Sequence, residues 1–156
     1  MTKDNKDKKS QKTDIPHYIS MESAVGSVLM IATKSAKYKY LFSHDYEWMI
    51  IPPIAAKQYS LFRNDNNEPI AFVSFATVNE EVEKRLLAGS LKLSPTDWRS
   101  GKKIYIIDVI SPFVPAAEIL KQIGENQLKD KEVHVLKPSQ NKKGGNIAIT
   151  LKEFLI

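Results

Sequence analysis

Apolar residues recur at helical spacing in three segments of this 156-residue chain and follow strand-like patterns in five others. In the first helical segment Ala24, Val28 and Ala32 fall on one face. Ser20 stands just before this segment, and serine is a favoured helix N-cap because its hydroxyl accepts from a free backbone N–H. The spacing predicts a helix that starts after Ser20 and ends near Ser35.

Two further helices are predicted later in the chain. Asn79 can cap a short helix over residues 80–87, and Gly89 would close it. Pro115 at a first helical position opens another helix with apolar residues at helical spacing, which Gly124 would interrupt.

The clearest strand signals lie in the middle of the chain. Residues 58–63 and 70–77 are rich in aromatic and β-branched residues, and the Asn- and Asp-rich stretch 64–69 between them predicts a hairpin. Residues 104–110 form an apolar run, typical of a buried strand, which contains a single acid, Asp108.

The C-terminal part predicts two more strands, at residues 132–136 and 146–154, with a Gly-containing turn at residues 142–145. Strands in one sheet, with helices before and between them, indicate an α+β, or mixed α/β, fold. The aromatic and basic segment 37–44 has no clear period, and we expect it to form a loop over the functional site.

Composition narrows the class of protein. The chain is 42% hydrophobic and 26% charged, which is ordinary for one soluble globular domain. No apolar run is long enough to span a bilayer. The absence of cysteine excludes disulfides, cysteine-ligated zinc and a cysteine thioester intermediate. No glycine-rich phosphate loop and no metal-ligand spacing is present, so we expect no bound cofactor or metal and a cytoplasmic location.

The net charge is +5, and part of it lies in a leader. Residues 1–14 hold five lysines and three aspartates without an apolar face, which predicts a disordered basic leader before a domain over residues 15–156. The remaining positive charge suits an acidic partner. Nucleic acid ranks last among such partners because the chain has no nucleic-acid motif and no dense basic stripe.

Asp108 is the first candidate for chemistry. A carboxylate among isoleucine and valine costs free energy unless it is paired or hydrogen-bonded, and such residues are often functional. The alternative is a structural acid that pairs with a nearby base.

Several motifs occur together in a fixed order. Asp97-Trp98-Arg99-Ser100-Gly101 precedes the strand that contains Ile107-Asp108-Val109-Ile110-Ser111-Pro112-Phe113, and earlier come Gln58-Tyr59 and Pro69-Ile70-Ala71-Phe72-Val73-Ser74-Phe75-Ala76. This order resembles the toxin-activating lysine acyltransferases, small bacterial enzymes that fatty-acylate pore-forming RTX toxins. The resemblance is good from about Ala24 to Phe113, weak after that, and absent in the first twenty or so residues.

The resemblance implies a single-domain, acetyltransferase-like (GNAT-like) fold with a central, mostly antiparallel sheet flanked by helices. It also implies a reaction: a fatty acyl group passes from acyl carrier protein, which is acidic, to a lysine of a partner protein toxin. A homodimer is compatible with the sequence.

The family carries a catalytic His in a Ser-Pro-x-His pattern and a catalytic Asp, and Asp108 matches the Asp. The segment that matches the His pattern ends in Tyr38, so Tyr38 occupies the His position. A tyrosine with a pKa near 10 is a poor base, but it can donate a hydrogen bond to an oxyanion or simply pack. His44, six residues later, is a candidate substitute base. Two hypotheses follow: an acyltransferase with a rebuilt catalytic pair, or an inactive relative that binds an acyl carrier or another protein.

Overall fold

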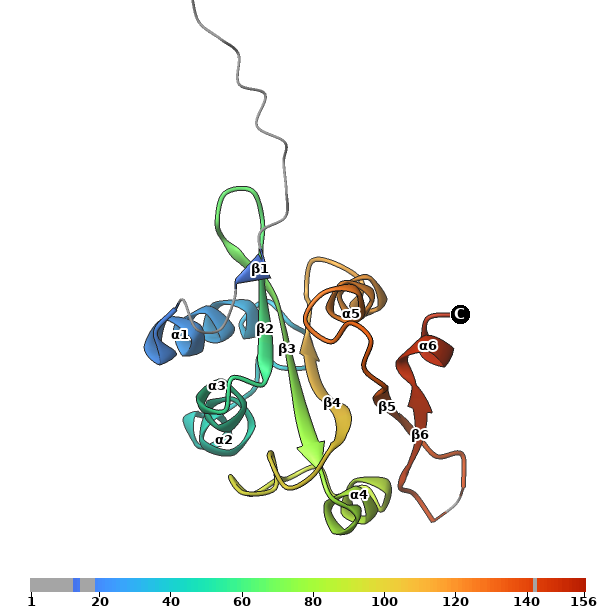
Figure 1. The fold of residues 1–156 in the computed structure, drawn as a ribbon. Coiled ribbons are helices and arrows are strands. Elements are labelled where there is room, and N and C mark those ends of the chain that lie inside the picture. Colours follow the sequence, from blue (N-terminus) through green and yellow to red (C-terminus); the bar gives the residue numbers. More distant parts are fainter. Residues whose placement is uncertain (1–12, 15–18, 142) are drawn as a thin grey trace, which may run out of the picture.

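A computed structural model describes residues 13–14, 19–141 and 143–156 and shows a central sheet with helices packed against it (Figure 1). The strands follow the order β1-β2-β3-β4-β5-β6. Their bounds are β1 Thr13–Asp14, β2 Tyr59–Arg63, β3 Pro69–Val78, β4 Lys103–Ile110, β5 Val133–Pro138 and β6 Asn146–Thr150. Every neighbouring pair is antiparallel except β4 and β5, which are parallel. The mixed α/β, GNAT-like fold expected from the sequence is confirmed.

The helices occupy the connections between strands and the end of the chain. Their bounds are α1 Met21–Ala32, α2 Ser43–Met49, α3 Ile51–Ala55, α4 Glu80–Leu87, α5 Ala116–Glu125 and α6 Leu151–Phe154. None of the helices in the described part of the chain is both long and apolar enough to cross a bilayer.

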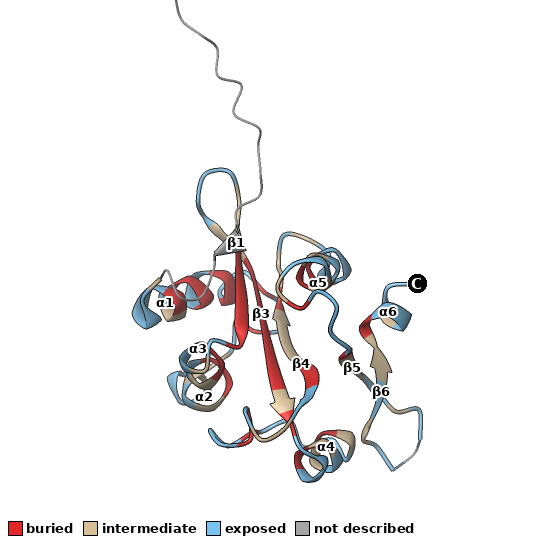
Figure 2. Cartoon of the chain, in the orientation of Figure 1, coloured by how far each residue is buried: buried red, intermediate tan, exposed pale blue. Residues whose placement is uncertain are grey.

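The hydrophobic core lies on both faces of the sheet, as the buried residues of β2 and β3 show (Figure 2). Side chains alternate between faces along a strand, so Val73 and Phe75 of β3 pack in the cluster that contains the buried residues of α5. Phe72 faces the opposite side and packs with α1 and α3, while Ala76 and Val78 on that side pack with α4. The face away from α5 therefore carries two separate clusters.

The helix and hairpin predictions are largely confirmed. The Ser20 hydroxyl accepts a hydrogen bond from the Ser23 backbone N–H at the start of α1, and Asn79 caps α4 in the same way through Val82. Strands β2 and β3 form the predicted hairpin. Helix α5 runs through Gly124 and ends one residue later at Glu125, so the predicted interruption at the glycine does not occur.

Several other predictions are wrong. Ser43 and His44, expected in a loop, begin α2, and at the start of this helix the Asp45 carboxylate accepts the Phe42 backbone N–H at 2.8 Å. The last strand ends at Thr150, where the hydroxyl and Glu153 form a capping box that starts α6.

The predicted disordered leader needs one correction. Thr13 and Asp14 form β1 and pair with Phe62 and Leu61 of β2, so they are not irregular. Residues 1–12 lie outside the described residues, and the boundary predicted between leader and domain stays a prediction.

Two irregularities of the sheet meet on β4. Ser74 of β3 lies opposite Asp108, but the next residue, Phe75, lies opposite Ile106, so Ile107 is an extra residue that makes a β-bulge. The parallel pairing of β4 with β5 also ends at Ile106, opposite Val135. Bulges redirect side chains and occur often beside active sites. Asp108 thus comes just after a bulge, where β4 has left its β5 partner.

Candidate active site

Asp108 and Tyr38 meet through a direct hydrogen bond. The Tyr38 hydroxyl donates to Oδ1 of Asp108 at 3.0 Å, across 70 residues of sequence. Tyr38 is only 7% exposed, and its backbone N–H donates to the Ser35 hydroxyl just after α1. Of the three sequence-predicted site residues, the structure therefore brings two together.

The sheet fixes the position of Asp108, the other member of this pair. Asp108 lies near the C-terminal end of β4, which has a neighbouring strand on each side in the sheet, and the exposure of the residue is intermediate. Its backbone N–H donates to the hydroxyl of Ser74, a completely buried residue on β3, at 3.1 Å. The bulge at Ile107 and the Ser74 contact together determine where the Asp108 side chain points.

The pair lies between the two clusters on the sheet face away from α5. Tyr38 packs with Phe72 and Ile110 in the first cluster, and Ala76 with Tyr105 begins the second. Ser74 and Asp108 face each other between these residues on β3 and β4. The polar Tyr38–Asp108 pair thus lies at the boundary between the two apolar clusters on this face.

Burial has the largest effect on the pKa of both Asp108 and Tyr38. Desolvation raises the pKa of Asp108, while the Tyr38 hydrogen bond and the charge of Lys37 lower it in part. Burial and the neighbouring Asp108 carboxylate raise the pKa of Tyr38 far above its ordinary value, against a smaller opposite effect of the Val109 backbone N–H. Tyr38 is therefore a protonated hydrogen-bond donor at physiological pH, and Asp108 is the group that can exchange a proton.

Lys37 places a positive charge beside the pair. Its ammonium nitrogen lies 5.1 Å from the centroid of the Tyr38 ring, and the side chain is exposed. No sequence signal singles out this lysine, because many lysines of the chain are exposed.

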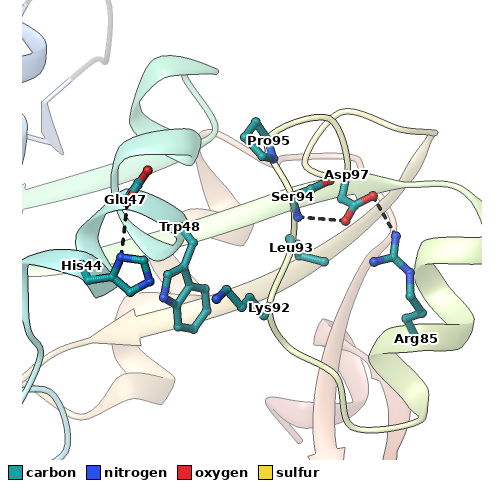
Figure 3. A pocket seen from close by; sticks show the side chains of 9 residues that line it. All are labelled: His44, Glu47, Trp48, Arg85, Lys92, Leu93, Ser94, Pro95 and Asp97. Atoms are coloured by element: carbon teal, nitrogen blue, oxygen red, sulfur yellow. Dashed lines mark hydrogen bonds and ion pairs between the residues drawn. The ribbon is translucent and has the colours of Figure 1, made fainter.

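His44, the third predicted site residue, lies away from the Tyr38–Asp108 pair. Its imidazole is on the first turn of α2, is 73% exposed and contacts the Glu47 carboxylate at 3.3 Å. Among the described residues, no contact joins it to Tyr38 or Asp108. Instead it lines a cavity of about 500 Å³ between α2 and the loop before β4, together with Trp48 and Lys92 (Figure 3).

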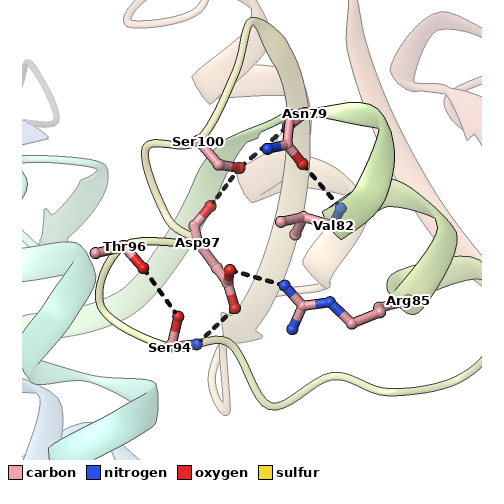
Figure 4. Close-up of polar contacts among 7 residues, drawn as sticks. All are labelled: Asn79, Val82, Arg85, Ser94, Thr96, Asp97 and Ser100. Atoms are coloured by element: carbon pink, nitrogen blue, oxygen red, sulfur yellow. Dashed lines mark hydrogen bonds and ion pairs between the residues drawn. The ribbon is translucent and has the colours of Figure 1, made fainter.

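The Asp-Trp-x-Ser-Gly motif has a structural role (Figure 4). The Asp97 carboxylate accepts from the Arg85 guanidinium at 2.7 Å and from the Ser94 backbone N–H at 2.8 Å. Burial opposes ionisation of Asp97, but these donors hold its pKa below the ordinary value. The Ser100 hydroxyl donates to the Asp97 carbonyl and accepts from the Asn79 backbone N–H. The motif therefore fixes the turn that leads from α4 into β4.

At Gly101 the backbone of this turn passes close to the backbone at the end of β3. A Cβ at this position would lie 2.3 Å from the Val78 carbonyl oxygen, and the Gly101 N–H donates to the Thr77 carbonyl at 3.0 Å. Only a residue without a side chain fits there, which explains the glycine of the motif.

Comparison with known proteins gives the family. The model of the RTX toxin acyltransferase family matches residues 18–151, which is most of the chain. The fold is that of an acetyltransferase-like protein, and the chain is a member of the RTX toxin acyltransferase family, as its motifs indicated.

Individual relatives agree with this assignment. The chain is 29% identical over 103 residues to a lysine-acyltransferase RtxC of Vibrio cholerae, covering 66% of this chain and 67% of the relative. It is 33% identical over 99 residues to a leukotoxin-activating lysine-acyltransferase LktC of a Pasteurella haemolytica-like species, covering 64% of this chain and 59% of that one. It is also 33% identical over 91 residues to a protein-lysine myristoyltransferase RtxC of Kingella kingae, covering 58% and 54%. The matched region thus spans about half to two thirds of these relatives.

The turn before β4 yields a stability prediction. Gly101→Ala should lower the free energy of unfolding by about 1–3 kcal/mol, because the added methyl group collides with backbone that cannot move aside. Gly26→Ala is the control: nothing lies within 4 Å of a Cβ at this α1 position, so alanine should raise stability by about 0.5–1 kcal/mol. Urea denaturation of both variants measures the difference, and equal midpoints would contradict the backbone contact.

Proposed function

We propose that this protein transfers a fatty acyl group from acyl carrier protein to the ε-amine of a lysine on a partner protein toxin. The observation that carries the proposal is the hydrogen bond between Tyr38 and Asp108 at the bulge of β4. Membership of the family and relatives named lysine-acyltransferases support the reaction class.

The reaction needs a base, because a lysine ammonium cannot attack a carbonyl until it loses a proton. Asp108 suits this role because burial raises its pKa toward the range in which a carboxylate is an effective general base. In the proposed step the Asp108 carboxylate takes a proton from the ammonium group. The amine then attacks the thioester carbonyl carbon, the C–N bond forms, the C–S bond breaks and the carrier thiol leaves.

Tyr38 acts as a positioning residue in this proposal. Its hydroxyl cannot serve as a base because burial and Asp108 keep it protonated. By donating to Oδ1 it fixes the carboxylate and favours its ionised form, so Oδ2 remains for the incoming ammonium. The family pair of His and Asp would thus be replaced by Asp108 supported by a neutral phenol.

The donor would approach from the edge of β4. Beyond Ile106 this strand is not paired with β5, which leaves backbone beside Asp108 for an extended thioester arm. The net charge of +5 favours an acidic carrier protein.

A first test of the proposed reaction compares the two candidate bases, Asp108 and His44. Asp108→Asn should lower the rate of myristoyl transfer from loaded acyl carrier protein to an RTX toxin about a hundredfold or more, the usual contribution of a general base. His44→Ala should retain most of the activity, since His44 is exposed and contacts Glu47 instead. The opposite ranking would assign the base to His44. Absence of transfer by the wild-type protein would favour a binding protein that has lost catalysis.

A second test of the proposed reaction concerns the pH dependence of the transfer rate. The Tyr38 hydrogen bond lowers the pKa of Asp108, so its removal in Tyr38→Phe should raise that pKa further. A base must be deprotonated to act, and the acid limb of the kcat/KM profile should therefore move to higher pH. Loss of activity with an unmoved limb would mean that Tyr38 only supports the fold.

A further inference from the structure

We propose that Lys37 is itself an acyl acceptor, so that the protein acylates its own active-site lysine when no toxin is bound. This inference rests on the proposed function. It follows from the position of one amine relative to the pair that would perform the chemistry.

The Lys37 amine lies beside the Tyr38–Asp108 pair. Its nitrogen is 5.1 Å from the Tyr38 ring centroid, and the hydroxyl of that same ring donates to Asp108 at 3.0 Å. Lys37 is also the cation whose charge acts on the Asp108 carboxylate. An acceptor lysine of a toxin would have to bring its ammonium group to the same carboxylate.

Lys37 is also free to react. The residue is exposed, and within the described ranges it forms no ion pair that would hold its ammonium group elsewhere. Its side chain is a flexible chain of four methylene groups, so the ammonium group can take up different positions around the Tyr38 ring.

The proposed step balances without any reagent beyond an acyl thioester. Asp108 takes one proton from the Lys37 ammonium, and the amine attacks the thioester carbonyl carbon. The amide C–N bond forms as the C–S bond breaks, and the carrier thiolate leaves and is protonated. A second proton is released from nitrogen, so the products are an acylated Lys37, a free thiol and one proton.

Acylation would change the site. The amide carries no charge, so the attraction that lowers the pKa of Asp108 would be lost, and an acyl chain would lie against Tyr38. The modified protein should therefore differ from the unmodified protein in the pH dependence of transfer to a toxin.

The chain contains a matched control. Lys39 stands over the ring of Tyr40 at 5.0 Å, nearly the same geometry as Lys37 over Tyr38. Tyr40, however, is 72% exposed, and no contact within the described residues joins it to Asp108. Two lysines in one segment thus share the aromatic contact and differ in their access to the proposed base.

The test incubates the full-length protein with myristoyl-loaded acyl carrier protein and no toxin, followed by intact mass and peptide mapping. A myristoyl group is chosen because one relative is named a protein-lysine myristoyltransferase. The expected result is one adduct, located on Lys37. It should be absent in Lys37→Arg, reduced at least a hundredfold in rate in Asp108→Asn and unchanged in Lys39→Arg.

Three results would overturn the inference. Equal labelling of Lys37 and Lys39 would indicate uncatalysed chemistry of exposed amines. An unmodified Lys37 in a preparation that acylates a toxin in a parallel reaction would refute self-acylation and leave the proposed function intact. No transfer to Lys37 and none to a toxin would refute both.

Discussion

The hydrogen bond from Tyr38 to Asp108 is the interaction on which the site depends. It joins the segment after α1 to the central strand β4 and provides a donor for a carboxylate set in an apolar face. Without such a donor, desolvation alone would favour the protonated acid. A hydrogen bond to a charged group typically contributes about 1.5–3 kcal/mol, enough to decide the side-chain conformation. The conformation and ionisation of Asp108 on β4 therefore depend on the position of the segment that follows α1.

The sheet creates the place where this bond can form. The bulge at Ile107 changes the register of β4 against β3, and the pairing with β5 stops one residue earlier. The Ser74 hydroxyl, fully buried, then holds the Asp108 backbone N–H. A regular β4 paired along its whole length would have neither the redirected side chain nor the free edge. These two irregularities of the sheet thus position the proposed base and leave open the strand edge along which the donor is proposed to approach.

Much of this could be predicted from the sequence, for local reasons. Helix α1 and the hairpin follow from side-chain periodicity and from turn residues close to one another, and Asp108 stood out as an acid in an apolar run. Helices α2 and α3 were missed because they are too short for an apolar period to show, and α6 because its signal is a capping box of only four residues. The proximity of Tyr38 to Asp108 could be suggested only by family resemblance, since 70 residues separate them. His44 is the opposite case. It lies only six residues after Tyr38 in the sequence, but α2 directs its imidazole to Glu47 and away from Asp108.

Tyr38 stands where the family resemblance predicts a histidine, and this is the main chemical question that the protein raises. A histidine can accept and donate protons near neutral pH, whereas Tyr38 stays protonated and can only donate. Proton transfer would then depend on Asp108 alone. A carbon NMR titration of the Asp108 carboxyl group in the wild type and in Tyr38→Phe measures this directly. We expect a pKa above the ordinary value of about 3.9 in the wild type and a higher one in the variant. An ordinary pKa that does not change on loss of the hydroxyl would contradict the proposed role of the pair.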